Sequence, residues 1–212
     1  MPIDLAEMLD PGHSAVLTME VQRGVLGGLP ALGAAVEEVG ILPNLRRLLA
    51  GARRAGVAVV HCTAGPLLVP GAPPNYPGAA AMARRGAGVP ASGPAALGST
   101  RADLAPEIGP EPSDLVVERH QGVTPFTGTE LDGVLRRLGV TTVVASGISL
   151  NVGIVALCAE AVSLGYRVAV AVDAVAGVPA AYGRAVLENA IPFLATRLGV
   201  DELCAIWEPV AR

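Results

Sequence analysis

The stretch 140-VTTVVASGISLNVGIVALCAEAVSLGYRVAVAVDAV-175 decides the fold. It begins with an apolar, β-branched run at 140–147, continues with helical spacing through 151–165, and returns to an apolar run at 167–175. Nearly continuous apolar character, rather than alternation, is typical of strands buried on both faces of a parallel sheet. Gly165 follows the middle segment, at a position where glycine commonly ends a helix. The stretch therefore predicts a strand–helix–strand unit.

The same alternation of apolar runs and amphipathic segments recurs along the rest of the chain. Strands that alternate with helices form right-handed βαβ units, and these build an open, doubly wound α/β sheet. We predict the further strands at 15–20, 57–62, 114–119 and 202–207, and the further helices at 36–56, 129–139 and 179–199.

We expect residues 1–212 to form one domain, because a chain of this length builds one sizeable core, and two domains would be cramped. Residues 63–113 interrupt the pattern and are rich in Pro, Gly and Ala. Loops of this length are usually functional or disordered. Because strands of one sheet are predicted on either side, an excursion over the active-site edge or into a subunit contact fits better than a linker between domains.

Composition excludes several classes of partner. The net charge is −4 and aromatic residues make up 3% of the chain, so we expect no nucleic-acid surface. The longest apolar run is broken by Asp173 and is shorter than the roughly 20 residues of a spanning helix, so we expect no membrane association. The N-terminus has no signal-peptide pattern, and the three cysteines form no C-x-x-C motif. We expect a cytoplasmic protein in a reducing compartment.

Polar residues gather where the predicted strands end. In an open α/β sheet, ligands bind beyond the carboxyl ends of the strands. We call the edge of the sheet where the carboxyl ends of the strands lie the rim. This rule places the following residues at the rim: Glu20, His61, 119-RHQ-121, the turn at 147–151 and Asp173. We expect a small-molecule site at this rim.

Four segments carry a resemblance to a known family: 20-EVQ-22, 126-FTGTELDGVLRRLGVTTVVASGIS-149, Asn151 at the start of a helix, and 165-GYRVAVAVDAVAG-177. Through them the chain resembles the isochorismatase-like, or cysteine hydrolase, family over most of its length. The resemblance implies a Rossmann-like, three-layer α/β/α fold with a six-stranded, mostly parallel sheet. It also implies a homo-oligomer, a dimer or a tetramer.

The resemblance implies a catalytic triad, and all three of its positions are changed here. Amidases of the family use an Asp after the first strand, a Lys after the third, and a Cys near the start of the helix after the fourth. The carboxylate falls on Glu20, the lysine on Arg119 or His120, and the cysteine on Gly153. All 15 basic residues of the chain are arginines, so no lysine can take the missing role from another position.

Cys158 does not replace the missing nucleophile. Five residues of helix advance by about 500° and about 7.5 Å, so Cys158 points roughly 140° away from position 153. We expect it to be buried, as free cysteines commonly are. The chain is therefore not a thiol amidase at the usual position.

The turn before Gly153 is expected to contribute to the site. The resemblance implies backbone donors at Ser149 and Leu150 and a cis peptide bond between Ile148 and Ser149. Asn151 occupies a helix N-cap position, which capping alone explains, although we also include it among the residues that contact a ligand.

No metal site or cofactor is expected. His61 is expected among the substrate-binding residues, but it has no H-x-x-x-H or D-x-H pattern around it, and a zinc site needs about three ligands. No G-x-G-x-x-G or P-loop pattern occurs at a strand–helix turn.

Two functions remain open from the sequence. In the first, the chain is a hydrolase that acts without cysteine on a small, anionic metabolite. Glu20 then serves as general acid or base with a water molecule, and Arg119 or His120 is its partner. Arginine stays charged, so it is suited to binding an anionic group through its several N–H donors rather than to transferring protons. In the second, the chain is a catalytically inactive member that binds a small ligand or serves in assembly.

Overall fold

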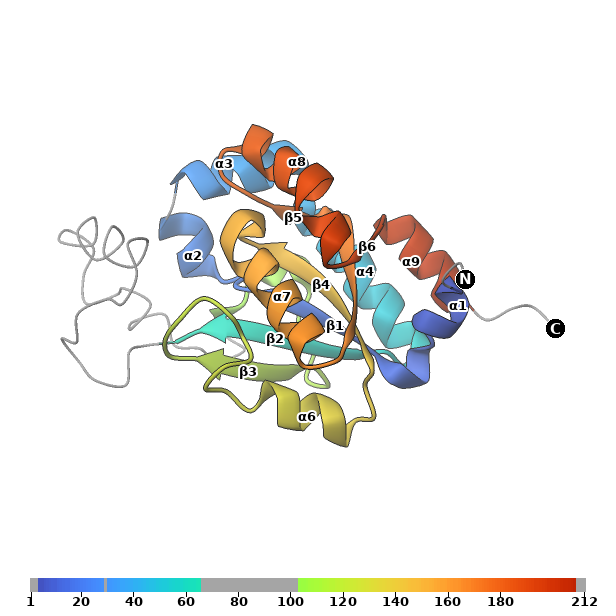
Figure 1. The fold of residues 1–212 in the computed structure, drawn as a ribbon. Coiled ribbons are helices and arrows are strands. Elements are labelled where there is room, and N and C mark those ends of the chain that lie inside the picture. The colour runs from blue at the N-terminus through green and yellow to red at the C-terminus, as the bar shows by residue number, and fades with distance from the viewer. Residues whose placement is uncertain (1–3, 29, 66–102, 209–212) are drawn as a thin grey trace.

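A computed structural model describes residues 4–28, 30–65 and 103–208. Six strands form one sheet in the order β3-β2-β1-β4-β5-β6, with every neighbouring pair parallel (Figure 1). The predicted Rossmann-like fold class is confirmed. The strands are β1 (Ser14–Met19), β2 (Ala58–Ala64), β3 (Leu115–Arg119), β4 (Thr142–Ile148), β5 (Arg167–Ala176) and β6 (Thr196–Leu198).

Helices cover both faces of the sheet, which gives the three-layer arrangement seen in Figure 1. No helix in the described ranges is long and apolar enough to cross a membrane. Packed into the core on one face are α1 (Leu5–Met8), α2 (Arg23–Gly28), α3 (Pro30–Val39), α4 (Ile41–Ala55) and α9 (Val200–Trp207). The other core holds α6 (Leu131–Arg137), α7 (Val155–Ser163) and α8 (Ala180–Asn189). Short helical turns are η1 (Pro11–His13), η4 (Pro106–Ile108), η5 (Leu150–Ile154) and η6 (Ile191–Phe193).

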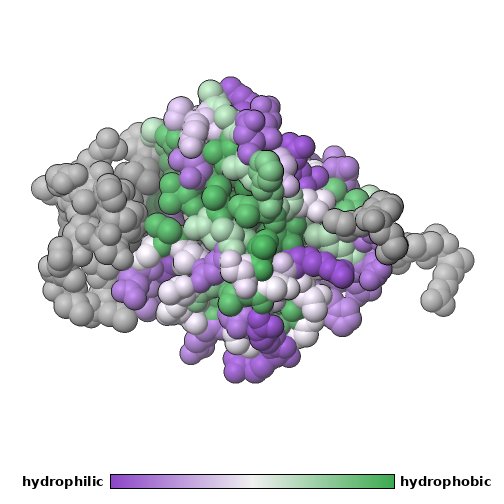
Figure 2. All heavy atoms as spheres, viewed as in Figure 1, coloured by the Kyte–Doolittle hydropathy of each residue, from purple (hydrophilic) through white to green (hydrophobic). Residues whose placement is uncertain are grey.

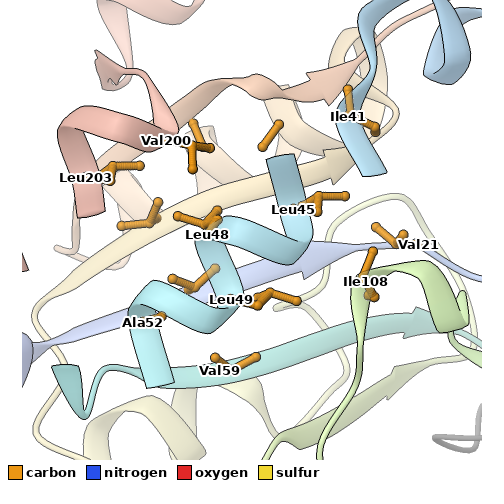
Figure 3. Close-up of a cluster of buried hydrophobic side chains, with 14 of the residues drawn as sticks. Val21, Ile41, Leu45, Leu48, Leu49, Ala52, Val59, Ile108, Val200 and Leu203 are labelled. Atoms are coloured by element: carbon orange, nitrogen blue, oxygen red, sulfur yellow. The ribbon is translucent and has the colours of Figure 1, made fainter. Parts of the chain in front are cut away.

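Helix α4 supplies much of the core on its face of the sheet. Its residues Leu45, Leu48 and Leu49 are fully buried at helical spacing, and they pack between the strands and α9 (Figure 3). Burial of a leucine side chain contributes on the order of 2 kcal/mol. The helix ends at Gly56, whose φ of 77° lies in the left-handed region that glycine adopts readily.

The C-terminal part of the chain differs from the sequence prediction. The strand predicted at 202–207 is wrong: these residues belong to α9, and the sixth strand lies at Thr196–Leu198, inside the predicted helix 179–199. A strand of three residues is too short to show a pattern. Helix α9 buries Val200, Leu203 and Trp207, which lie at helical spacing, and its first turn is closed by the Glu202 carboxylate, which accepts from the Gly199 N–H at 2.7 Å.

The end of the Pro/Gly/Ala-rich excursion packs against the residues that follow β1. Ala105 donates its N–H to the Val21 carbonyl at 3.0 Å, and Leu104 forms an antiparallel bridge with Gln22. Leu104, Ala105 and Ile108 are buried. Residues 66–102, on which the expected excursion over the active-site edge or into a subunit contact mainly falls, lie outside the described ranges.

His61 does not lie at the rim, where the sequence prediction puts it. Strand β2 continues to Ala64, so His61 sits within the sheet, opposite Thr18 of β1, and is fully buried. Its Nε2 donates to Asp114 Oδ2 at 3.1 Å, and its Nδ1 shares a hydrogen bond with Thr18 Oγ1 at 2.7 Å. Arg53 of α4 donates to both oxygens of Asp114, at 3.0 and 2.7 Å. His61 therefore belongs to a buried polar network that links the sheet to α4.

This network sets the ionisation of Asp114. Burial acts to raise the pKa of the Asp114 carboxyl, but the hydrogen bonds from His61 and Arg53 and the charge of Arg53 outweigh it. The pKa therefore lies well below its ordinary value of about 4. A depressed folded-state pKa stabilises the fold above the unfolded-state pKa, and this stabilisation is lost as the pH falls toward the folded-state pKa.

We expect Asp114→Asn to lower the free energy of unfolding by about 3 kcal/mol at neutral pH, since it leaves Arg53 without its buried partner. The deficit relative to wild type should stay constant above about pH 5 and shrink below about pH 4. Urea denaturation across this pH range measures it. As a matched control, Glu111→Gln should cost at most about 1 kcal/mol, because the Glu111 side chain is 56% exposed. Equal losses in the two variants would contradict the role of the buried network.

Candidate active site

Glu20 follows the last residue of β1 in an unusual backbone conformation. Its φ of 52° makes it the one non-glycine residue in the described part of the chain with a positive φ. The Glu20 N–H donates to the Cys62 carbonyl at 2.9 Å, and the Glu20 carbonyl accepts from the Gln22 N–H at 2.8 Å. A residue with a side chain is less stable in this conformation by about 1 kcal/mol or more. The neighbouring strand thus holds Glu20 in a strained conformation at the rim.

The side chain of Gln22 fixes the other side of this turn to β2. Its side-chain amide donates to the Ala64 carbonyl at 3.1 Å, and its side-chain oxygen accepts from the Ala64 N–H at 2.8 Å. Gln22 is fully buried, so its polar side chain needs hydrogen-bond partners inside the protein. These two bonds take the place of the backbone hydrogen bonds between β1 and β2 beyond the end of β1. The position of Glu20 is therefore fixed by β2 from both sides.

Arg119, the last residue of β3, forms an ion pair with Glu20. Its Nη2 donates to Glu20 Oε1, and its Nη1 donates to the Gly122 carbonyl. The Arg119 side chain is 8% exposed and that of Glu20 is 22% exposed, so the pair is only weakly screened by water. Burial lowers the pKa of the Arg119 guanidinium from its ordinary value, but arginine remains charged in proteins.

Of the two residues that the sequence leaves open for the lysine position, Arg119 lies against Glu20. His120 lies beside it and is directed elsewhere, with its Nδ1 3.6 Å from Glu118 Oε1. His120 is partly exposed. The geometry thus joins Glu20 to Arg119 directly, with His120 next to the pair in sequence.

The turn after β4 forms another wall of the rim. The Ile148–Ser149 peptide bond is cis, as the resemblance implies. The following turn η5 is π-helical, and its Ile154 N–H donates to the Ser149 carbonyl at 3.0 Å. Asn151 Oδ1 accepts from the Val178 N–H at 3.0 Å and ties the turn to the segment after β5. Leu150 is 1% exposed and packs into the core, so its backbone rather than its side chain is left to contact a ligand.

Met19 occupies the space beside Gly153. A Cβ atom at position 153 would lie 3.2 Å from Met19 Cε, 3.3 Å from Met19 Cγ and 3.5 Å from the Ile148 carbonyl oxygen. Both residues are buried. The side chain of the last residue of β1 therefore packs so close to Gly153 that a side chain added there would force Met19 to shift. Alternation along β1 could have indicated this contact from the sequence, because it puts Met19 on the face that α7 covers.

The two cysteines nearest the site are not activated. Cys62 and Cys158 lie in the core, and burial raises the pKa of each thiol to about 12. The thiolate is the reactive form, so neither is poised as a nucleophile near neutral pH. Among the described residues, no three His, Cys, Asp or Glu side chains are grouped so that they could hold a metal ion.

The isochorismatase domain model matches residues 14–202. The chain belongs to the isochorismatase family. It is 30% identical over 218 residues to the ureidoacrylate amidohydrolase RutB of Pseudomonas syringae pv. syringae, a match that covers 96% of this chain and 87% of that protein. It is also 42% identical over 66 residues to the uncharacterized isochorismatase family protein YwoC of Bacillus subtilis, which covers 31% and 34% of the two chains.

Solved structures of the family share the fold. An isochorismatase family protein from Burkholderia thailandensis superposes with a TM-score of 0.71 at 25% identity, covering 93% of this chain and 97% of that one. An N-carbamoylsarcosine amidase from Thermoplasma acidophilum superposes with a TM-score of 0.68 at 25% identity, covering 90% of this chain and 98% of that one. A cysteine hydrolase from Pseudomonas syringae pv. phaseolicola superposes with a TM-score of 0.73 at 21% identity, covering 98% of this chain and 95% of that one. This last match shows a likeness of fold alone.

The contact between Gly153 and Met19 predicts a coupled pair of substitutions. Gly153→Ala should lower the free energy of unfolding by about 1 kcal/mol, because the added methyl group forces the Met19 side chain to shift. In a Met19→Ala background the same change should be neutral or stabilising, since the clash is gone and alanine favours a helix over glycine by up to about 1 kcal/mol. Denaturation of the four proteins gives the coupling energy. An equal cost of Gly153→Ala in both backgrounds would show that the two positions do not compete for space.

Proposed function

We propose that this chain is a hydrolase of small molecules in which Glu20 and a water molecule take the place of a cysteine nucleophile. The observation that supports this most is the state of Glu20. A carboxylate held at a strained φ and ion-paired to a nearly buried arginine is costly to maintain, and such costs are concentrated at functional sites. Neither of the nearby cysteines offers an alternative nucleophile, for the reasons of burial and pKa given above.

The ion pair fits a proton-accepting role for Glu20. A carboxylate paired with a guanidinium is ionised, so it can take a proton from a water molecule as that water attacks the substrate carbon. The proton can then pass to the leaving group from the same carboxyl. Arg119 stays charged throughout and acts as a positioning residue and a source of positive field, and His120 follows it directly in the chain.

The backbone of the turn after β4 is suited to an oxygen that gains charge. Backbone N–H groups in the first turn of a helix lack intrahelical partners, and here that turn begins at Leu150 directly after Ser149. We assign Ser149, Leu150, Asn151 and Gly153 to this wall, as substrate-contacting backbone. Donors placed in this way stabilise a developing oxyanion and are worth about 3 kcal/mol each in related chemistry.

The substrate class follows from relatives of similar length. The names ureidoacrylate amidohydrolase and N-carbamoylsarcosine amidase both denote enzymes that cleave C–N bonds of ureido or amide groups. We therefore propose a small ureido or amide compound with an anionic group as substrate.

A second candidate function is supported by a different observation. Met19 packs tightly against Gly153, and the Leu150 side chain is buried, so little room is left at the position that carries the nucleophile in family amidases. This packing favours a catalytically inactive member that binds a small ligand over the same backbone wall.

A turnover assay separates the two functions. We expect wild-type protein to hydrolyse at least one member of a panel of ureido acids and amides, monitored by ammonia release or loss of substrate. Glu20→Gln should lower kcat by about 100-fold or more while binding persists, because the general base is lost. The matched control Cys158→Ala should keep kcat, since a buried thiol takes no part, with folding of both variants checked by circular dichroism.

Two outcomes would contradict the proposal. If Glu20→Gln keeps wild-type kcat, Glu20 is not the base. If the panel is bound but not turned over, the second candidate function is the correct one.

A further inference from the structure

The segment that follows β3 binds the Arg119 guanidinium on the side away from Glu20. Residues 120–130 connect β3 to α6, and we call them the β3–α6 loop. Arg119 Nη1 donates to the Gly122 carbonyl of this loop, while Nη2 donates to Glu20. The guanidinium is planar and rigid, so a shift of Gly122 also moves the donor that faces the Glu20 carboxylate. The position of the loop therefore affects the ion pair of the candidate site.

Glu160 of α7 holds the β3–α6 loop through two hydrogen bonds. Thr124 Oγ1 donates to Glu160 Oε2, and Thr127 Oγ1 donates to Glu160 Oε1, so both carboxylate oxygens have a partner in the loop. Thr124 Oγ1 also accepts from the Phe126 N–H at 3.4 Å, which connects the loop backbone to the same hydroxyl. Hydrogen bonds to a carboxylate are stronger than those between neutral groups. Two points of the loop are thus fixed to one side chain of α7.

Glu160 is unusual for its helix. Figure 2 shows hydrophobic residues gathered across the face on which α7 lies, with hydrophilic residues around them. The α7 sequence contains one charged residue, which is Glu160, and its packing against the core is made by Leu157, Cys158 and Ala161. Glu160 is partly buried, so water competes for its oxygens less than on a fully exposed side chain. Packing of the helix does not require this carboxylate, whereas the two threonine hydroxyls use both of its oxygens.

The same helix carries the backbone wall of the site. Turn η5, which contains Gly153, ends at Ile154, and α7 continues from Val155 without a break. Glu160 lies seven residues after Gly153. Seven residues make about two helical turns, so the two positions face a similar direction, roughly 10 Å apart along the axis. The bonds of Glu160 therefore fix the loop that binds Arg119 relative to the wall that contains Gly153.

We propose that Glu160 is a positioning residue of the active site, which orients the Arg119 guanidinium toward Glu20 through the β3–α6 loop. A role in stability alone would leave the ion pair unchanged in a folded variant. The positioning role requires the Arg119 guanidinium to loosen when the loop is released from α7. The effect on turnover rests on the hydrolase function proposed above, whereas the effect on Arg119 does not.

The double variant Thr124→Val with Thr127→Val tests this role, because valine has nearly the shape of threonine and lacks the hydroxyl. NMR of the full chain labelled with ¹⁵N-arginine measures how fast the Arg119 guanidinium protons exchange with water, and the Arg119→Lys spectrum assigns their signals. We expect exchange in the double variant to be faster by about tenfold, since the guanidinium loses hydrogen-bond protection. With a panel compound that is hydrolysed, kcat should fall by about tenfold and KM should change little, because Arg119 acts on Glu20.

Three further variants serve as controls. Thr124→Ser with Thr127→Ser keeps both hydroxyls and should keep wild-type exchange and kcat. Thr141→Val removes an exposed threonine hydroxyl directly before β4, at the opposite edge of the sheet, and should also behave as wild type. Glu160→Gln keeps one acceptor oxygen for two hydroxyls and should give an intermediate effect. Circular dichroism checks folding, and Glu160→Gln decides if the double valine variant does not fold.

Two results would overturn the positioning role. The first is wild-type exchange of the Arg119 protons in both the double valine variant and Glu160→Gln. The second is an unchanged kcat in these variants when the wild type turns over a panel compound. If the wild type hydrolyses no panel compound, the proposed hydrolase function fails, and the exchange measurement alone still decides whether Glu160 orients Arg119.

Discussion

The ion pair between Glu20 and Arg119 is the interaction on which the candidate site depends. It joins residues at the ends of β1 and β3 across the intervening strand β2, and it lies where water screens it weakly. The backbone bonds of Glu20 and the side-chain bonds of Gln22 hold the carboxylate in place from β2. If the carboxylate were removed, a nearly buried guanidinium would be left without its partner, which is a costly arrangement.

The residues at the three positions that the resemblance assigns to a triad form a consistent set. A glutamate is one methylene longer than an aspartate and reaches Arg119, which has the planar fork that a carboxylate binds well. Met19 packs tightly against the glycine at 153. The Cβ of a cysteine at 153 would lie 3.2 Å from Met19 Cε, so the Met19 side chain would have to shift to admit it.

Most of the fold could be predicted from the sequence, because five of the six strands are long apolar runs with helices between them. The sixth strand could not, since Thr196–Leu198 is three residues long and its neighbour α9 has an apolar content that resembles a strand. Within the site, the rule for strand ends located Glu20 and Arg119. It misplaced His61, because apolar character does not show that β2 continues three residues beyond it. Alternation along β1 puts Met19 on the face that α7 covers, but which residue of that face it meets depends on tertiary packing.

The central claim is that water, activated by Glu20, attacks the substrate without a covalent intermediate on the protein. Rapid-quench mass spectrometry of the intact protein, during a single turnover in H₂¹⁸O of a panel compound that is hydrolysed, tests this directly. We expect the product to carry one ¹⁸O and the protein mass to stay unchanged at every time point. A transient increase in protein mass by the acyl or carbamoyl group, mapped to Cys62, Cys158 or Cys204, would contradict it.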